Sequence, residues 1–135
     1  MNKVLQWNCK GILGKFNELS NSISEYDIVC LQETWLKPDH RIGFTGYKTI
    51  RSDRCGMRSG GGTAVICRNG LDPLQVGHVP KFFHGVEMTA VSVKIREILV
   101  DRILIVSLYK PPEVSLDRQQ WLDLFEILGI GFLIL

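Results

Sequence analysis

The first 32 residues contain two apolar segments separated by one amphipathic segment, and this order restricts the fold more than any other feature of the chain. Residues 3–8 and 27–32 have the composition of β-strands, whereas Leu19 and Ile23 recur at helical spacing within residues 17–24. A strand, a helix and a second strand within about 30 residues are typical of a βαβ unit. Such a unit joins two parallel strands by a right-handed crossover. The pattern therefore predicts an α/β fold.

The chain beyond this unit contains more segments with the composition of strands. They are predicted at residues 47–52, 63–68, 86–96 and 102–108. Apolar and polar side chains alternate toward the end of residues 86–96, so we expect one wetter face there. Residues 102–108 are almost continuously apolar, and we expect this strand at the centre of a sheet.

A second helix is predicted near the end of the chain. We expect Ser115 to be its N-cap and Gly129 to stop it after Leu128. Residues 131–135 are predicted to begin a further buried strand. The apolar stripe of the helix consists of Trp121, Leu124, Phe125 and Leu128.

Composition sets only broad limits on function. The 135 residues suffice for one domain, and 45% hydrophobic and 22% charged residues are ordinary for a globular protein. A net charge of +2 permits an anionic partner but does not argue for one. The N-terminus lacks the apolar region of a signal peptide. The apolar residues 127–135 are far fewer than the ~20 that span a bilayer.

The four cysteines, Cys9, Cys30, Cys55 and Cys67, are widely spaced. They form no C-x-x-C pair, and no histidine stands at zinc-finger spacing. We therefore expect buried thiols in a reducing compartment rather than disulfides or metal ligands.

Polar residues stand at the carboxyl ends of the apolar strands. Asn8, Glu33 and Tyr109 each follow such a segment. In open α/β sheets ligands bind outside the carboxyl ends of strands, so we predict that the three converge on one cleft. A carboxylate there could hold Mg²⁺, which takes one or two protein carboxylates. Taken singly, each residue could equally be a solvated turn residue or the polar rim of the core.

Four short motifs carry a resemblance that decides between these alternatives. They are Trp7-Asn8-Cys9, Leu31-Gln32-Glu33-Thr34-Trp35, Gly60-Gly61-Gly62-Thr63-Ala64-Val65 and Tyr109-Lys110-Pro111-Pro112. In their order and approximate spacing they resemble the endonuclease/exonuclease/phosphatase superfamily. The L-Q-E-T-W and Y-x-P-P forms resemble most the endonuclease domains of jockey-like non-LTR (LINE-type) retrotransposons.

The resemblance implies a two-sheet α/β sandwich that hydrolyses phosphodiesters with Mg²⁺ or Mn²⁺. It implies that Glu33 is the metal ligand, that Asn8 orients the metal site or the phosphate, and that Tyr109 contacts the phosphate. Thr34 and Trp35 are expected to support the site or pack behind it. The partner would be the phosphate backbone of DNA, and the place of action the nucleus. Residues 1–135 would be the N-terminal part of the domain, truncated before its C-terminal strands.

The sequence departs from the family in one respect. The family's later G-D-x-N and S-D-H motifs do not occur in these residues. His40, His78 and His84 lie well before the expected position, and we interpret them as surface histidines. We therefore expect the chain alone to be inactive.

The glycine-rich residues 54–62 are predicted to form an exposed loop, with the glycines at 60–62 as a turn into the next strand. Basic residues surround this loop. They could contact DNA phosphates or simply be solvated. They are Arg51, Arg54, Arg58 and Arg68.

Two alternatives for function stay open at this stage. A phosphatase acting on inositol phosphates or a sphingomyelinase-like enzyme would use the same fold and the same Asn8 and Glu33. A decayed or domesticated remnant would only bind, or do nothing.

The chain expressed alone is expected to aggregate, self-associate or unfold partly. The reason is that strands of a second sheet are expected mostly from sequence outside these residues, which leaves an apolar face and an unpaired edge exposed. Size-exclusion chromatography with thermal melting tests this. A sharp monomer peak with one cooperative melt would contradict it.

Overall fold

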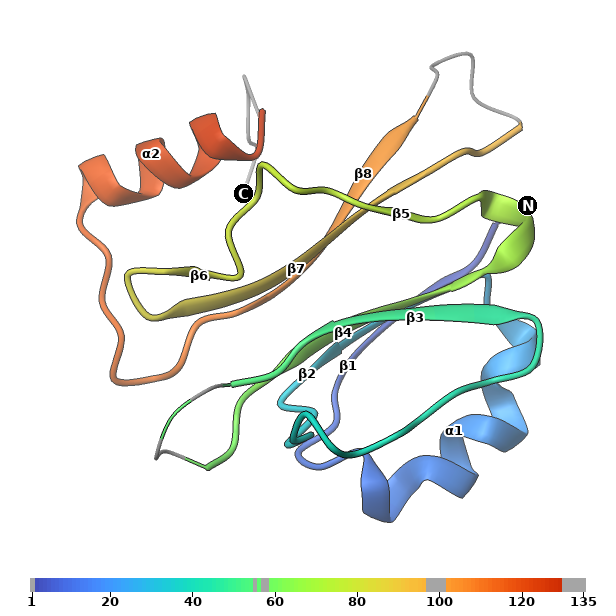
Figure 1. Cartoon of the computed structure of the whole chain (residues 1–135). Helices are drawn as coiled ribbons and strands as arrows, with labels where there is room; N and C mark the ends of the chain where they lie inside the picture. The colour runs from blue at the N-terminus through green and yellow to red at the C-terminus, as the bar shows by residue number, and fades with distance from the viewer. Residues whose placement is uncertain (1, 55, 57–58, 97–101, 130–135) are drawn as a thin grey trace.

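The structure is a computed structural model that describes residues 2–54, 56, 59–96 and 102–129. These residues form two packed four-stranded sheets with one α-helix on the outer side of each (Figure 1). The first sheet has the order β1 (Val4–Asn8), β2 (Ile28–Gln32), β4 (Thr63–Arg68) and β3 (Tyr47–Ser52). The second consists of β5 (Leu74–Gln75), β6 (Phe82–Phe83), β7 (Val86–Val93) and β8 (Ile103–Tyr109). The helices are α1 (Phe16–Ser22) and α2 (Arg118–Ile127), with 3-10 turns η1 (Leu13–Lys15), η2 (Ile23–Glu25) and η3 (Asn69–Leu71).

The predicted βαβ unit is present. β1 and β2 are parallel, and α1 lies between them in the chain. All five residues of β2 are buried because both faces of this strand are covered. Val29 and Leu31 pack toward α1, whereas Ile28 and Cys30 pack toward the second sheet. The strand β4 then joins antiparallel to β2 and makes the sheet mixed.

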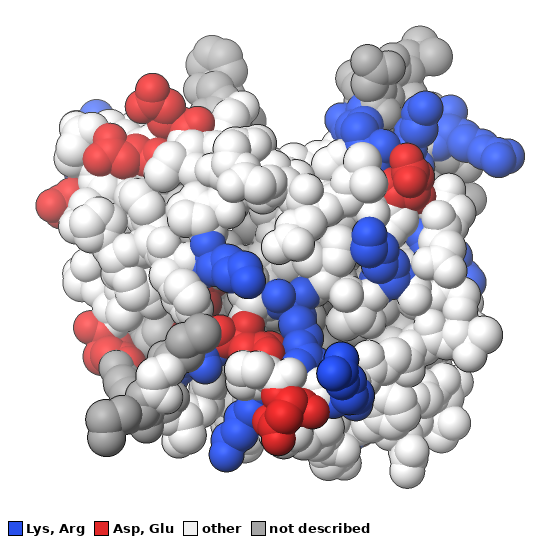
Figure 2. Space-filling model, viewed as in Figure 1, with Lys and Arg blue, Asp and Glu red and all other residues white. Residues whose placement is uncertain are grey.

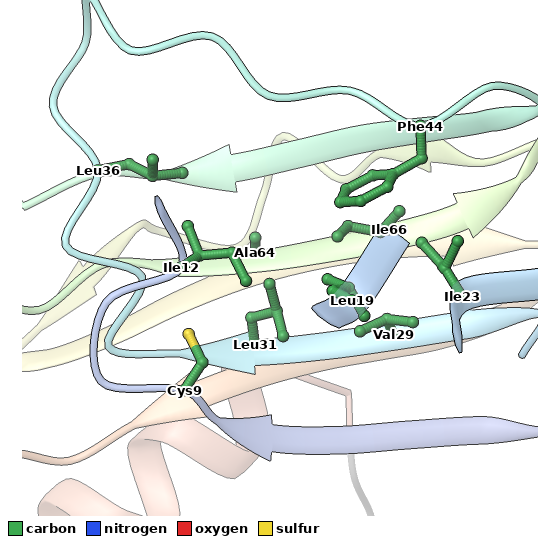
Figure 3. Packing of buried hydrophobic residues seen from close by; sticks show 10 residues of the cluster. All are labelled: Cys9, Ile12, Leu19, Ile23, Val29, Leu31, Leu36, Phe44, Ala64 and Ile66. Carbon is green, nitrogen blue, oxygen red and sulfur yellow. The ribbon is translucent and has the colours of Figure 1, made fainter. Parts of the chain in front are cut away.

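The outer face of the first sheet carries the larger core (Figure 3). Leu19 and Ile23, the helical pair predicted from the sequence, are buried there against Val29 and Ile66. Phe44 closes the same cluster and stacks on the ring of Phe16 with centroids 5.1 Å apart. Hydrophobic burial of this face therefore fixes α1 on the sheet.

The inner faces of the two sheets pack directly on each other. Ile28, Val65 and Cys67 from the first sheet contact Val91 and Val93 from the second. The strands of the second sheet were expected to come mostly from outside these residues, but four of them, β5–β8, lie in the described part of the chain and cover the first sheet. The exposed apolar face expected from the sequence is thus covered in the described part of the chain.

β8 differs from its predicted central position. Among the described residues it pairs only with β7, and most of its side chains are half-buried. Its continuous apolar sequence has another cause. Ile103 and Ile105 pack toward the first sheet, whereas Leu104 and Val106 pack toward α2, so layers cover both faces.

α2 forms as predicted but begins later. Asp117, not Ser115, is the N-cap: its carboxylate accepts a hydrogen bond from the Gln120 N–H at 2.8 Å, and the Gln120 side chain accepts one from the Asp117 N–H at 2.9 Å. This capping box satisfies two donors that Ser115 would leave unpaired. In the predicted stripe, Leu124 and Leu128 are buried, Trp121 packs at the edge of that core, and Phe125 lies against the Trp121 ring. Gly129 ends the helix with a φ of 72°.

Other predictions met mixed outcomes. The wetter face of β7 exists only at its end, where Ser92 is half-buried and Lys94 exposed, because residues 86–91 are buried on both faces. The two-residue strands β5 and β6 were not predicted, since so short a segment shows no alternation. The strand predicted at residues 131–135 lies outside the described residues.

Three of the four cysteines are described, and all three are free and buried, as expected. Burial raises the pKa of the Cys30 thiol to about 11 and that of Cys67 to about 12. Cys55 lies outside the described residues. No helix in the described part of the chain is long and apolar enough to cross a membrane.

A buried hydroxyl cluster joins the two sheets at the start of β4 and the end of β3. Thr89 Oγ1 lies 2.8 Å from Thr63 Oγ1, 3.0 Å from Ser52 Oγ and 3.1 Å from the Thr63 carbonyl oxygen. All three side chains are at most 3% exposed. Buried hydroxyls without partners are costly, so this cluster holds the sheets in one register.

Thr89→Val should lower the free energy of unfolding by about 1–3 kcal/mol, because the isosteric methyl leaves the Thr63 and Ser52 hydroxyls without their buried partner. Urea denaturation measures this loss. Thr45→Val, at an exposed turn position, is the matched control and should change stability by no more than about 0.5 kcal/mol. Equal effects of the two substitutions would show that the cluster does not contribute.

Candidate active site

A cavity of about 930 Å³ opens at the edge of the sandwich where several strands end. Its wall includes Glu33 and Trp35 after β2, Arg54 after β3 and Tyr109 at the end of β8. Gly61, just before β4, completes the same wall. Both sheets therefore contribute to one site, at the edge predicted from the sequence.

Charged side chains of both signs surround this region. Figure 2 shows charged side chains of both signs spread over this face, and some of them lie in its lower half near the loop between β3 and β4. Neither sign covers that face alone, which agrees with the small net charge of +2. Local geometry rather than a broad electrostatic field must therefore select a ligand here.

The structure brings Glu33 and Tyr109 together. Burial raises the pKa of the Tyr109 hydroxyl, and the charge of Glu33 and a side-chain hydrogen bond with it raise that pKa further. The phenol therefore stays protonated at neutral pH, and its single O–H donates the hydrogen bond to the Glu33 carboxylate.

Asn8 lies beside this pair without lining the cavity. It is the last residue of β1, it is exposed, and it pairs in register with Gln32, the residue before Glu33. The structure thus places Asn8 at the same sheet edge as Glu33, but outside the cavity wall formed by Glu33 and Tyr109.

Gln32, the last residue of β2, fixes the end of this strand against β8, which ends at Tyr109. Its amide donates a hydrogen bond to the Ser107 hydroxyl at 2.9 Å, and this hydroxyl donates to the Leu31 carbonyl at 2.7 Å. Gln32 and Ser107 are 5% and 0% exposed. Since Ser107 stands two residues before Tyr109, this buried link sets the distance between the two sheets at the site.

The backbone around Glu33 is strained. Glu33 and Trp35 have φ angles of 54° and 57°, in the left-handed region that side-chain-bearing residues avoid. Each such residue costs on the order of 1–3 kcal/mol unless its surroundings hold it. On one side, the Gly11 N–H donates to the Glu33 carbonyl at 2.8 Å and the Ile12 N–H to the Thr34 carbonyl at 3.0 Å.

The glycine triplet, residues 60–62, holds the other side of the segment from Glu33 to Trp35. The Thr34 N–H donates to the Gly62 carbonyl at 3.2 Å, and the Trp35 N–H donates to the Gly61 carbonyl at 2.9 Å. A Cβ at Gly62 would lie 2.5 Å from Thr34 Oγ1, and one at Gly61 would lie 2.3 Å from Arg54 Nε. The prediction of a turn with positive φ is confirmed, but Gly61 and Gly62 are buried rather than part of an exposed loop. Close backbone approach explains the glycines here.

A buried carboxylate that the sequence analysis missed anchors the triplet. Glu87 on β7 is 2% exposed; its Oε2 accepts from Arg54 Nη2 at 2.6 Å and Nε at 3.2 Å, and its Oε1 accepts from the Gly62 N–H at 2.9 Å. The hydrogen bond that the Arg54 guanidinium donates to Glu87 is the main cause that raises the pKa of Arg54. Glu87 also pairs in register with Tyr109. The sequence offered one sign of this role. Glu87 stands inside the apolar segment of β7, where burying an unpaired charge would cost too much free energy, so a partner was to be expected.

The predicted arginine cluster is divided among separate contacts. Arg54 alone of the described members lines the cavity. Arg51 binds the carbonyls of Lys37 and His40 and pairs with Asp53. Arg68 pairs with Asp27, and Arg58 lies outside the described residues.

The histidines differ from one another. His78 and His84 are exposed, as expected. His40 is half-buried, and its Nδ1 accepts a hydrogen bond from the Lys37 N–H at 2.9 Å, so it stabilises a turn. The residue before it, Asp39, lines the cavity and was not singled out from the sequence.

Thr34 and Trp35 also differ. Thr34 is fully buried, which agrees with the expected supporting role. Trp35 is 47% exposed, so the expectation that it packs behind the site was wrong.

The oxygen donors at this site fit a loosely held Mg²⁺ or Mn²⁺. The described residues contain no group of three His, Cys, Asp or Glu side chains that could enclose a metal. Mg²⁺ does not require such a group, since it commonly binds one or two carboxylates and keeps its waters. The Glu33 carboxylate, at the wall of an open cavity, has the required chemistry.

Comparison with known proteins places the chain in a family. The profile of the Endonuclease/Exonuclease/phosphatase family matches residues 5–131. Since this match covers nearly the whole sequence, the chain belongs to that family. No curated protein sequence matches it.

Solved structures share the fold. The endonuclease domain of TRAS1, a telomere-specific non-LTR retrotransposon, has a TM-score of 0.63 at 18% identity, over 96% of this chain and 54% of its own. The AP endonuclease LMAP from Leishmania major has 0.60 at 20% identity, over 80% and 40%. The catalytic domain of Xenopus laevis APE2 has 0.60 at 18%, over 95% and 52%. Such identities show the fold alone, and the chain spans about half of these structures or less.

Gly62→Ala tests the close approach of the triplet to Thr34. The new Cβ would enter the space of the Thr34 hydroxyl, so we expect an overpacking loss of about 1–3 kcal/mol in addition to the backbone strain. Gly46→Ala is the matched control, because Gly46 has a similar φ of 85° and nothing within 4 Å of the added Cβ. Urea denaturation compares the two variants. Equal losses would mean that backbone strain alone explains the glycine at position 62.

Proposed function

We propose that this chain is part of a metal-dependent DNA endonuclease domain that hydrolyses phosphodiester bonds. The observation that carries the proposal is the pairing of Glu33 with the protonated phenol of Tyr109 at the wall of an open cavity. Membership of the Endonuclease/Exonuclease/phosphatase family supports it, as does a fold shared with DNA-processing enzymes such as an AP endonuclease.

Each residue has a distinct task in this proposal. Glu33 would hold Mg²⁺ or Mn²⁺, with Asn8 beside it to orient the bound waters or the phosphate. The ion, when bound, supplies stabilisation of phosphate charge and lowers the pKa of a water molecule. The Tyr109 hydroxyl, which has a single proton, would donate it to a phosphate oxygen once the Glu33 carboxylate binds the ion instead. Arg54 presents a permanent positive charge at the same wall, and Glu87 fixes its orientation.

Retrotransposon origin is the finer part of the proposal. The Leu31-Gln32-Glu33-Thr34-Trp35 and Tyr109-Lys110-Pro111-Pro112 motifs support it. So does the shared fold over 96% of this chain with the endonuclease domain of a non-LTR retrotransposon. The activity would then be nicking of target DNA in the nucleus, as part of a polyprotein with a reverse transcriptase.

A second candidate is a non-catalytic DNA-binding remnant. Residues 1–135 alone supply neither the G-D-x-N nor the S-D-H motif. Catalytic groups that act as a unit lose most of the rate when one is missing. Such a chain would keep the cavity and its metal ligand but not the turnover.

We expect the 135-residue chain to bind Mn²⁺ through Glu33 without nicking supercoiled plasmid in Mg²⁺. Glu33→Gln keeps the size of the side chain but removes its charge, and should weaken Mn²⁺ binding about tenfold or more in a titration followed by electron paramagnetic resonance. Glu113→Gln is the matched control, because Glu113 lines the same cavity.

The outcomes of this experiment separate the candidates. Equal Mn²⁺ affinity of the Glu33→Gln variant and the parent chain would overturn the role of Glu33. Nicking that disappears in Glu33→Gln would show that the chain is itself an endonuclease and that the missing motifs were overvalued. Metal binding without nicking agrees with the proposal for the site and with inactivity of these residues alone.

A further inference from the structure

Trp35 has a combination of features that neither packing nor metal binding explains. The side chain is 47% exposed, although it follows fully buried Thr34 directly. Its φ of 57° is one that a bulky residue avoids. An exposed indole on a strained backbone that two neighbouring segments hold in place indicates a contact with something outside the chain.

The indole rests on glycines. A Cβ at Gly11 would lie 2.6 Å from ring atom Cε3, and one at Gly60 would lie 3.7 Å from Nε1. The Trp35 N–H is bound to the Gly61 carbonyl at 2.9 Å. The ring is therefore fixed in position by backbone on one side, which lowers the entropy that a partner must remove on binding.

Trp35 separates the candidate site from a second hollow. This hollow has a volume of about 340 Å³, and Lys10 and Lys15 lie in its wall together with Leu13. Its wall includes no acidic residue in the described part of the chain. Lys15 is held in place by the Cys9 carbonyl and lies 5.7 Å from the centre of the Trp7 ring. One side of Trp35 thus faces a carboxylate–phenol site and the other a basic hollow.

We propose that Trp35 stacks on an unstacked DNA base next to the phosphate held at Glu33, and that the hollow with Lys10 and Lys15 receives the adjoining backbone phosphate. This inference rests on the proposed function, since it takes DNA as the ligand. Every base presents a π-face, and stacking on an aromatic side chain contributes to binding independently of sequence. The lysines add the phosphate attraction that a lone aromatic ring lacks. Leu13, 49% exposed, offers an apolar contact for the sugar.

Binding to two fluorescent DNA duplexes tests the stacking role. One duplex carries a single unpaired base, and the other carries a base-free abasic analogue at that position. Trp35→Ala should weaken binding of the first by about 5-fold to 150-fold and leave the second within about twofold. Trp35→Phe, which keeps an aromatic face, should recover part of the loss. Phe82→Ala is the matched control, since Phe82 is 42% exposed and lines neither hollow.

Salt dependence separates the phosphate contacts from stacking. Lys10→Ala should reduce the slope of log affinity against log salt concentration by about 0.9, whereas Trp35→Ala should leave this slope unchanged. Thermal melting of each variant excludes a loss of folding as the cause. The Mn²⁺ titration of Glu33→Gln runs in parallel and tests the proposed function independently of Trp35.

Several results would overturn the inference. They are no detectable binding of either duplex, no effect of Trp35→Ala, or an equal loss on both duplexes. Suppose that Trp35→Ala loses affinity only for the duplex with the unpaired base, while Glu33→Gln binds Mn²⁺ as the parent chain does. This result would support the stacking site and refute the metal-dependent activity. The reverse pattern would retain the proposed function and refute the stacking site.

Discussion

Buried polar contacts between the two sheets define the geometry of the candidate site. Along the paired strands β7 and β8, the inner residues change from Val93 and Ile103 at one end to Thr89 and Ser107 and then to Glu87 and Tyr109 at the other. The apolar end holds the sheets together without specifying direction, because hydrophobic packing is non-directional. The polar end specifies one arrangement, since each buried donor and acceptor requires a partner at fixed distance.

Glu87 has the central place in this arrangement. Its carboxylate binds Arg54 and the Gly62 N–H, and its strand position lies opposite Tyr109. A buried ion pair adds little net stability compared with apolar residues, but removal of one partner costs about 3–5 kcal/mol. Glu87 therefore matters less for how stable the domain is than for which conformation it adopts. Through Gly62 and Thr34, that conformation includes the strained backbone of Glu33.

The sequence predicts the elements of this fold better than their positions in the sheets. Period and composition identify the βαβ unit and the apolar stripe of α2, because a buried face imposes its own spacing. The same signals place β8 wrongly at the centre of its sheet. A strand whose two faces are both covered by other layers is apolar throughout, whether it lies at the centre or at the edge of the sheet. The sequence-based prediction also named Ser115 as the helix cap and missed Asp117, although Gln120 three residues later completes a capping box with Asp117.

The candidate site follows a similar division. Glu33 and Tyr109 are predictable, because strand ends are where α/β folds place ligands and the motifs around both resemble a known family. Glu87 and Asp39 are not predictable. The Glu87 carboxylate contacts residues that are 25 or more positions away in the sequence. Asp39 reaches the cavity wall only because of the course of the loop that carries it. Trp35 is misjudged for a different reason. Its neighbour Thr34 is buried whereas Trp35 is 47% exposed, and nothing in the sequence marks the left-handed backbone at Glu33 and Trp35. Composition and periodicity carry no information on φ angles, so the exposure of Trp35 in this segment could only come from the structure.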